Sequence, residues 1–205
     1  MNLRAGNYRI ARGGLHFQRP YLDNGARRFA SRLMTALPVL VRSALPEDDA
    51  AIRTLNERAF EGPIEAKLVD LLRDAGQAVV SLVAVLDHRI VGHILFSPVT
   101  VAEAQAGLRA ASLAPMSVLP ELQNRGIGSR LVVDGIEACR QRGFDLLVVL
   151  GHTNYYPRFG FQKASDHGLA SEYDAGDAFM VLELSEGALQ DVKGLVKYAP
   201  EFSEV

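Results

Sequence analysis

The chain has 205 residues, 48% of them hydrophobic and 22% charged, which is the balance of an ordinary soluble globular protein. One domain is the simplest count for this length, and it can bury about 70% of the surface that its unfolded chain exposes. No run of 18 apolar residues occurs, which excludes a transmembrane helix and gives no reason to expect a membrane partner. Cys139 is the only cysteine, so an intramolecular disulfide is excluded and a reducing, cytoplasmic location is expected.

Charge is distributed unevenly along the chain. Residues 1–33 contain seven arginines and one acid, Asp23, which gives a net charge of +6 and leaves −8 for residues 34–205 of a chain whose total is −2. The acidic main part is not expected to bind nucleic acid, and it would steer cations weakly toward itself. We treat residues 1–38 as a basic, poorly ordered extension. Translation that begins at Met34, a basic arm for RNA or a membrane, and a targeting segment all stay open.

Hydrophobic periodicity and turn signals predict the elements of the first half. Acids at residues 47–49 stand where a helix dipole favours them, and Gly62-Pro63 separates this helix from the next. The expected elements are a strand at 39–42, a helix that opens at 46–49, a helix at 64–74, and strands at 79–86 and 90–101 that flank a hairpin turn.

The second half is organised around a glycine-containing turn at residues 123–128, between a strand at 110–118 and a helix expected from Ser129 to about Arg142. Backbone N–H groups at the start of such a helix have no intrahelical partner, and glycines let an anion approach them. A purely structural turn is the alternative. The pattern is not a P-loop, and the dinucleotide fingerprint fails because residue 131 is Leu. The apolar segment 146–150 then predicts a strand buried on both faces, completing a right-handed strand-helix-strand unit.

A third phosphate-binding pattern does fit. Gln123-x-x-Gly126-x-Gly128, preceded by Val118-x-Pro120, resembles the acetyl-CoA-binding signature of the GNAT (Gcn5-related) N-acetyltransferase superfamily. Residues 154–161, Asn-Tyr-Tyr-Pro-Arg-Phe-Gly-Phe, resemble a later family element in which a tyrosine stands four residues before a Gly-Phe pair. Residues 92–96 and 145–151 resemble two of its strands, so the likeness covers roughly residues 39–184.

The resemblance implies an α/β (α+β) fold of GNAT type. Its mixed, twisted central sheet has about seven strands flanked by helices, and the parallel strands 4 and 5 splay apart at one end. The acetyltransferase domain is expected at residues 39–184. Residues 185–205 are expected to be a tail that packs as one or two short amphipathic turns.

The resemblance also implies which residues bind acetyl-CoA, the co-substrate. The splay leaves main-chain groups near Met116, Ser117 and Val118 without strand partners, and the pantetheine arm pairs there. The turn expected to bind the pyrophosphate, together with the asparagine by which the family helps to hold CoA, contributes further residues: Gln123, Asn124, Arg125, Gly126, Ile127, Gly128, Ser129 and Asn154.

Tyr156 has the spacing of the family tyrosine that protonates the CoA thiolate, a transfer that is feasible between groups with pKa values near ~8.5 and ~10. The alternative is that Tyr155 and Tyr156 both pack on the sheet. Arg158 is expected either to meet a phosphate or to pair with an acid. Residues 166–174 contain acids and a histidine, but no compact spacing predicts a metal site.

The resulting hypothesis is an N-acetyltransferase that moves an acetyl group from acetyl-CoA to a primary amine by direct attack in a ternary complex. The amine acceptor is not identified, and the strand at 110–118 contains no acid, which leaves Glu61, His93, His152 or bulk water as the base. A non-catalytic CoA-binding sensor or interaction module is the alternative. Edge strands in this fold often pair, so a homodimer is a further expectation.

Overall fold

The structure is a computed structural model that describes residues 38–104, 106–190 and 192–205. The expectations for residues 1–37 lie outside the described part. The helices are α1 (Asp49–Phe60), α2 (Ile64–Asp74) and α3 (Ile127–Gln141). The strands are β1 (Leu40–Ser43), β2 (Val80–Leu86), β3 (Arg89–Val101), β4 (Ala110–Val118), β5 (Leu146–Leu150), β6 (Gln162–Lys163), β7 (Leu169–Ser171), β8 (Phe179–Glu183) and β9 (Gly194–Lys197).

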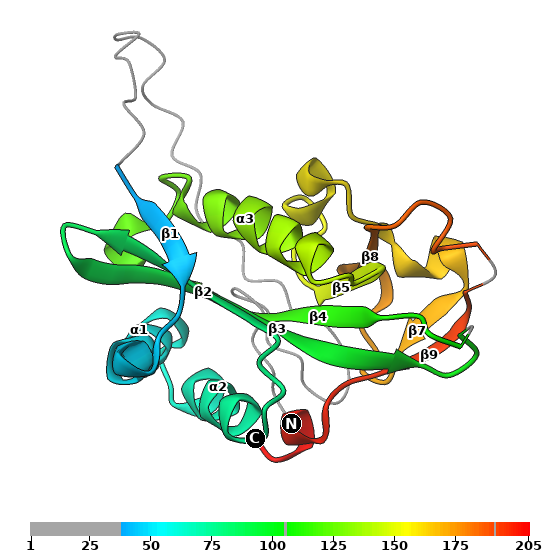
Figure 1. Cartoon of the computed structure of the whole chain (residues 1–205), viewed down its shortest axis with the longest axis horizontal. Coiled ribbons are helices and arrows are strands. Elements are labelled where there is room, and N and C mark those ends of the chain that lie inside the picture. Colours follow the sequence, from blue (N-terminus) through cyan, green and yellow to red (C-terminus); the bar gives the residue numbers. More distant parts are fainter. Residues whose placement is uncertain (1–37, 105, 191) are drawn as a thin grey trace, which may run out of the picture.

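The strands form one twisted sheet with helices on both faces (Figure 1). Its main path runs β1-β2-β3-β4-β5-β8-β6, while β9 pairs with the far end of β3 and β7 pairs with β9. β4 and β5 are parallel, and their neighbours on this path are antiparallel. The predicted fold class is therefore confirmed, with seven strands on the main path and two beside it.

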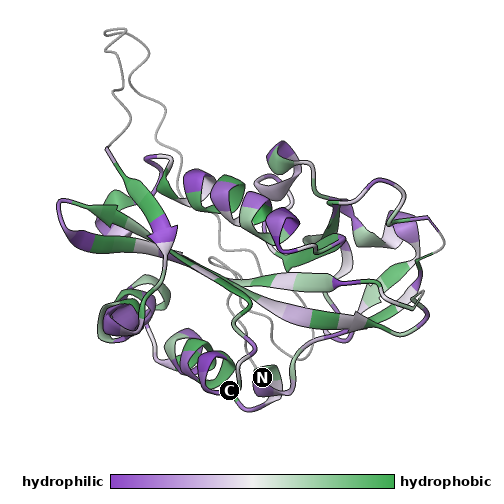
Figure 2. Cartoon of the chain, viewed as in Figure 1, coloured by the Kyte–Doolittle hydropathy of each residue, from purple (hydrophilic) through white to green (hydrophobic). Residues whose placement is uncertain are grey.

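α3 covers one face of the sheet, and α1 and α2 cover the other (Figure 1). The apolar stripe of α3 (Leu131, Val132, Ile136 and Cys139) is buried against β2, β3 and β4. Figure 2 shows the same division, with apolar residues along the central strands and polar residues on the outer sides of the helices. Among the described helices, none is long and apolar enough to cross a membrane.

β4 pairs with β3 along most of its length but with β5 only at its beginning. Its antiparallel partners on β3 run from Val99 to Gly92, whereas parallel pairing with β5 stops at Leu113. A register irregularity follows at once, because Phe96 pairs with Leu113 while Ile94 pairs with Met116. An extra residue of this kind bends a strand. Residues 114–118 therefore leave β5, and no described strand pairs with them on that side.

The segment after β8 differs from the expected tail. Residues 194–197 form β9, which pairs with Thr100 and Val101 at the end of β3. Phe202, in a short 3₁₀ helix at Pro200–Ser203, is 1% exposed and belongs to the core beneath α1 and α2. The apolar spacing in this segment is equally compatible with a helical turn. β2 pairs with β3 only up to Phe96, so that edge of β3 is free farther along the strand, and β9 pairs with it there.

Candidate active site

A cleft of about 490 Å³ lies where β4 separates from β5. Its walls come from the last turn of α1, the end of β4, the first turn of α3 and the segment after β5. It is lined by Ala59, Phe60, Met116, Ser117, Val118, Leu122, Gln123, Asn124, Gly126, Gly128, Ser129, His152, Tyr155 and Arg158.

The first turn of α3 presents backbone N–H groups to this cleft. Gly126 precedes the helix with a φ of 86°, and no side chain among the described residues caps the helix. The N–H of Arg130 donates to the Gly126 carbonyl at 3.0 Å, which closes the first turn. The preceding N–H groups of the turn have no acceptor within the helix. Together with the helix dipole, they favour an anion at this end of the cleft.

Gly128 keeps the space above this turn open. A Cβ at this position would lie 3.2 Å from the Tyr155 hydroxyl and 3.7 Å from the Cε of Met116. The hydroxyls of Tyr155 and Ser129 are 3.4 Å apart, so Tyr155 joins the segment after β5 to the start of α3. Any side chain at residue 128 would fill the space in which an anion could reach the backbone N–H groups.

Most of the predicted cofactor-binding residues meet in this cleft. Met116, Ser117, Val118, Gln123, Asn124, Gly126, Gly128 and Ser129 all line it. Arg125 and Asn154 are exposed and do not line it, and the side chain of Ile127 is buried in the core, so only its main chain is available. The Gln123 side-chain amide donates to the Val118 carbonyl at 3.1 Å, which ties the turn to the end of β4. The CoA contacts assigned to these residues stay predictions.

The two adjacent tyrosines have different surroundings. The Tyr155 hydroxyl lies at the first turn of α3, whereas Tyr156 is 5% exposed and its ring covers Gly151, the residue that follows β5. A Cβ at Gly151 would lie 2.2 Å from that ring, so the glycine is what allows the close approach. Burial raises the pKa of the Tyr156 phenol, so this group is protonated at neutral pH.

Arg158 is held in place at the mouth of the cleft. Its guanidinium stacks on the Tyr155 ring at 4.5 Å, and its Nε donates to the Tyr155 carbonyl at 2.9 Å. The terminal nitrogens make no ion pair with a described residue, so the structure supports neither of the two predicted partners over the other. A fixed positive charge at this place strengthens the preference of the cleft for anions.

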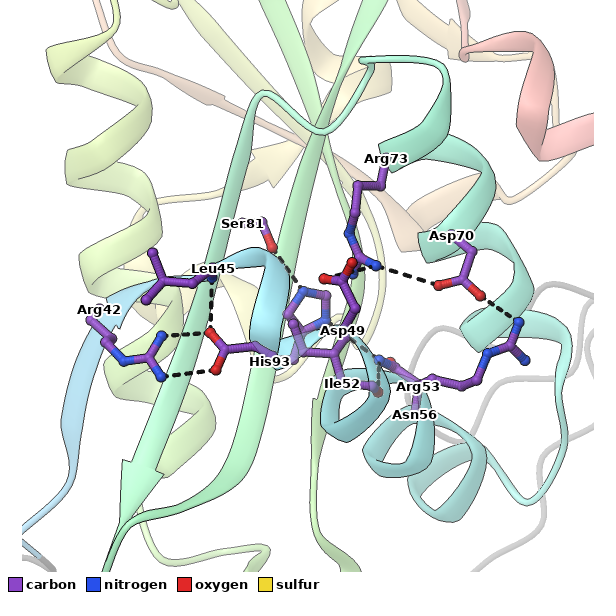
Figure 3. Close-up of polar contacts among 11 residues, drawn as sticks. Arg42, Leu45, Asp49, Ile52, Arg53, Asn56, Asp70, Arg73, Ser81 and His93 are labelled. Atoms are coloured by element: carbon purple, nitrogen blue, oxygen red, sulfur yellow. Dashed lines mark hydrogen bonds and ion pairs between the residues drawn. The ribbon is translucent and has the colours of Figure 1, made fainter.

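The candidate bases have different surroundings. His152 lines the cleft, and Glu61 is exposed at the end of α1, where its φ is 56°. His93 is fully buried under α1 (Figure 3), where its Nδ1 lies 3.5 Å from Asn56 Nδ2 and its Nε2 lies 3.0 Å from Ser81 Oγ. Burial lowers the pKa of His93 to about 3. A buried ring with both nitrogens engaged is poorly suited to receive a proton from a ligand.

Other nucleophiles and metal ligands are not gathered here. Cys139 is fully buried, and burial raises the pKa of its thiol to about 12, so it is a small core residue and not a nucleophile. Within the described ranges, no group of three or more His, Cys, Asp or Glu residues is placed to hold a metal ion.

Sequence reasoning missed one wall of the cleft. Ala59, Phe60 and Leu122 line it, and no motif in the sequence indicates that they contact a ligand. Phe60 ends an apolar helical stripe, a signal that predicts burial but not a ligand contact. The long-range packing of α1 on β4 brings it there.

Comparisons with known proteins agree with this architecture. The Acetyltransferase (GNAT) family model matches residues 50–161, more than half of the chain. The uncharacterized N-acetyltransferase YhbS of Escherichia coli strain K12 is 35% identical over 167 residues, covering 80% of this chain and 99% of YhbS. The uncharacterized N-acetyltransferase YjhQ of the same strain is 41% identical over 129 residues, covering 62% of this chain and 71% of YjhQ.

Two solved structures share the fold at similar identity. E. coli YhbS, a GNAT family N-acetyltransferase crystallised in complex with CoA, aligns with a TM-score of 0.77 and 36% identity over 82% of this chain and 93% of its own. A GNAT family acetyltransferase from Brucella melitensis in complex with acetyl-CoA aligns with a TM-score of 0.67 and 34% identity over 81% of this chain and 99% of its own.

Proposed function

The chain belongs to the GNAT family of acetyltransferases, and from that premise we propose that it transfers an acetyl group from acetyl-CoA to a primary amine by direct attack in a ternary complex. The observation that carries the proposal is the cleft in which the uncapped first turn of α3 meets the unpaired edge of β4. The solved relatives that hold CoA and acetyl-CoA support the choice of acetyl donor.

The residues of the cleft fit both ends of such a molecule. The N–H groups of the first turn of α3, with Arg158 beside them, suit a pyrophosphate. The free edge at residues 114–118 suits the two amide units of a pantetheine arm, because buried main-chain groups need hydrogen-bond partners. Acetyl-CoA supplies an activated acetyl group and a thiol as the leaving group.

The positions of the two tyrosines support different roles for them. Tyr156 does not line the cleft itself, but its ring covers Gly151 at the end of β5, and we propose it as the proton donor to the leaving thiolate. Desolvation raises the pKa of a phenol and of a thiol alike, so burial of both groups keeps the transfer feasible. Tyr155 stands at the first turn of α3, where it would help to hold the phosphate end.

The first test is thermal unfolding of the full chain with and without excess acetyl-CoA. A single-site ligand at a hundred times its Kd stabilises the native state by about 2.7 kcal/mol, which gives a clear upward shift in Tm. No shift at millimolar acetyl-CoA would remove the main support for the proposal. A positive result leads to a screen of amines for the release of CoA thiol.

Variants of the two tyrosines distinguish an active enzyme from a CoA-binding protein without activity. We expect Tyr156→Phe to lower kcat by about 100-fold without changing the affinity for acetyl-CoA. Tyr155→Phe should instead weaken CoA binding and change kcat little. The reverse pattern would move the proton donor to Tyr155. If an amine that the wild type acetylates is turned over equally by both variants, neither hydroxyl donates the proton.

A further inference from the structure

The end of β4 presents alternate side chains to the two faces of the sheet. Met116 faces α3, because its Cε lies within 4 Å of the space above Gly128. Ser117 therefore faces α1 and α2. Its cross-strand partner on β3 is His93, whose ring lies against Asn56 of α1 (Figure 3), and paired residues share a face. The cleft therefore has a second side, which faces α1 and α2, and Ser117 lines it.

Ser117 has an unfilled hydrogen-bonding position on this side. The residue is 3% exposed and lines the cleft, and its hydroxyl has no hydrogen-bond partner among the described residues. His93 does not supply one, because its two nitrogens contact Asn56 and Ser81. Buried polar atoms are almost always satisfied, so an unpaired hydroxyl on a cleft wall points to a ligand or an ordered water.

A second unpaired oxygen, on Asn56, lies on the same side of the sheet. The side-chain nitrogen of Asn56 donates to the Ile52 carbonyl at 2.8 Å and faces His93 Nδ1, which leaves Asn56 Oδ1 as the unpaired atom. Exchanging the amide O and N would place two acceptors, the Asn56 oxygen and the Ile52 carbonyl, against each other, so this orientation is fixed by its partners. Asn56 also lies one helical turn before Phe60, which lines the cleft.

We propose that Ser117 Oγ forms the subsite that receives the amino group of the acetyl acceptor, with Asn56 Oδ1 as a second hydrogen-bond acceptor on the same side of the sheet. The inference rests on the proposed function and specifies its acceptor side. An amide oxygen can only accept a hydrogen bond and a hydroxyl oxygen can accept two, so the complementary ligand is an N–H donor. An amine brought to this side of β4 would face a thioester held on the opposite, α3 side of the gap.

The charges around the cleft narrow the class of amine. The two oxygens are uncharged, while Arg158 and the positive end of α3 face the same space, which disfavours a second cation. At pH 7.5 an α-amino group with a pKa near 7.8 is roughly one third neutral, whereas a lysine ε-amino group with a pKa near 10.4 is roughly 0.1% neutral. The subsite therefore favours an acceptor that carries an α-amino group.

The test uses the full chain at saturating acetyl-CoA and two matched probes. Nε-acetyl-lysinamide offers only an α-amine, and Nα-acetyl-lysinamide offers only an ε-amine. Release of CoA thiol at pH 7.5 gives kcat and KM for the wild type, for Ser117→Ala and for a control, Ser112→Ala. Ser112 is also buried on β4, but its hydroxyl contacts Ser97 at 3.1 Å and it does not line the cleft.

We expect the wild type to prefer the α-amine probe by at least about tenfold in kcat/KM. Ser117→Ala should raise KM for that probe about tenfold, a factor equivalent to about 1.4 kcal/mol, without changing the acetyl-CoA-induced shift in Tm. Ser112→Ala should leave KM unchanged. An unaltered KM in Ser117→Ala overturns the subsite, and a preference for the ε-amine overturns the acceptor class.

The experiment can contradict the acetyl-CoA site and the acceptor subsite separately. If acetyl-CoA stabilises the wild type but neither probe releases CoA, the acceptor class is wrong while the donor site stands. If acetyl-CoA produces no shift at all, the proposed function itself fails, and this subsite fails with it.

Discussion

The two faces of the sheet around β4 contrast in how they are assembled. On the α3 face, the strand, the glycine turn and the helix are consecutive in the chain, and together they form the end of the cleft at which we propose that an anion binds. On the opposite face, α1, α2 and the C-terminal segment pack over a buried polar cluster whose members, such as Asn56 and His93, are distant in sequence. The first face is a continuous motif, while the second exists only in the folded chain.

This difference explains why one face can be recognised and the other must be observed. A continuous motif carries its geometry in the spacing of a few residues, as the glycines of the turn do for α3. A face built from separate elements depends on strand register and helix packing. Proteins that share the motif on the α3 face can therefore differ on the opposite face.

The largest expected effect tests whether the C-terminal segment belongs to the second face. Phe202→Ala should lower the free energy of unfolding by about 3–5 kcal/mol, because Phe202 is 1% exposed and the substitution leaves a cavity beneath α2. Urea unfolding measures the loss. Phe202→Leu, which keeps most of the volume, should cost less than about 1.5 kcal/mol. A loss below 1 kcal/mol in the alanine variant would show that this segment is only loosely attached.

The next effect tests the α3 face. Gly128→Val should weaken acetyl-CoA binding by at least about 100-fold, or about 2.7 kcal/mol, because a side chain there meets the Tyr155 hydroxyl and covers the N–H groups of the first turn. Isothermal titration calorimetry gives the Kd directly. Gly62→Val is the matched control, since a Cβ at Gly62 has no atom within 4 Å. Equal Kd values for acetyl-CoA in the two variants would show that the first turn of α3 does not bind the phosphates.

The smallest effect uses pH to probe the second face. The folded pKa of His93 is about 3, below its ordinary value near 6.5, so the unfolded chain binds the extra proton first. The stability that a neutral His93 provides is complete above pH 6.5 and falls as pH falls toward 3. Between pH 7 and pH 5 the loss is about 2 kcal/mol.

The pH dependence is isolated by comparing variants. Urea unfolding at pH 7 and pH 5 should show the loss in the wild type and not in His93→Gln, whatever the stability of that variant at pH 7. His88→Gln removes an exposed histidine from the neighbouring turn and should follow the wild type. Identical pH profiles for the wild type and His93→Gln would mean that His93 is not held neutral.

The sequence by itself determined the fold class, through the resemblance of the glycine turn and of residues 154–161 to GNAT motifs. It also determined the bounds of α2, β4 and β5, because these depend on short-range rules of periodicity and turn chemistry. The sequence predicted the start of α3 at Ser129. The helix begins two residues earlier, at Ile127, because the left-handed backbone conformation of Gly126 sets the boundary.

Only the tertiary structure decided the rest of the site. The pairing of β3 with β4 sets His93 beside Ser117, and the packing of α1 then brings Asn56 to the same place. The same structure separates Tyr155 from Tyr156, which local spacing treats as equivalent neighbours. It also converts the expected tail into β9, because the edge of β3 is free there. These outcomes depend on contacts between residues far apart in the chain, and such contacts leave no local pattern in the sequence.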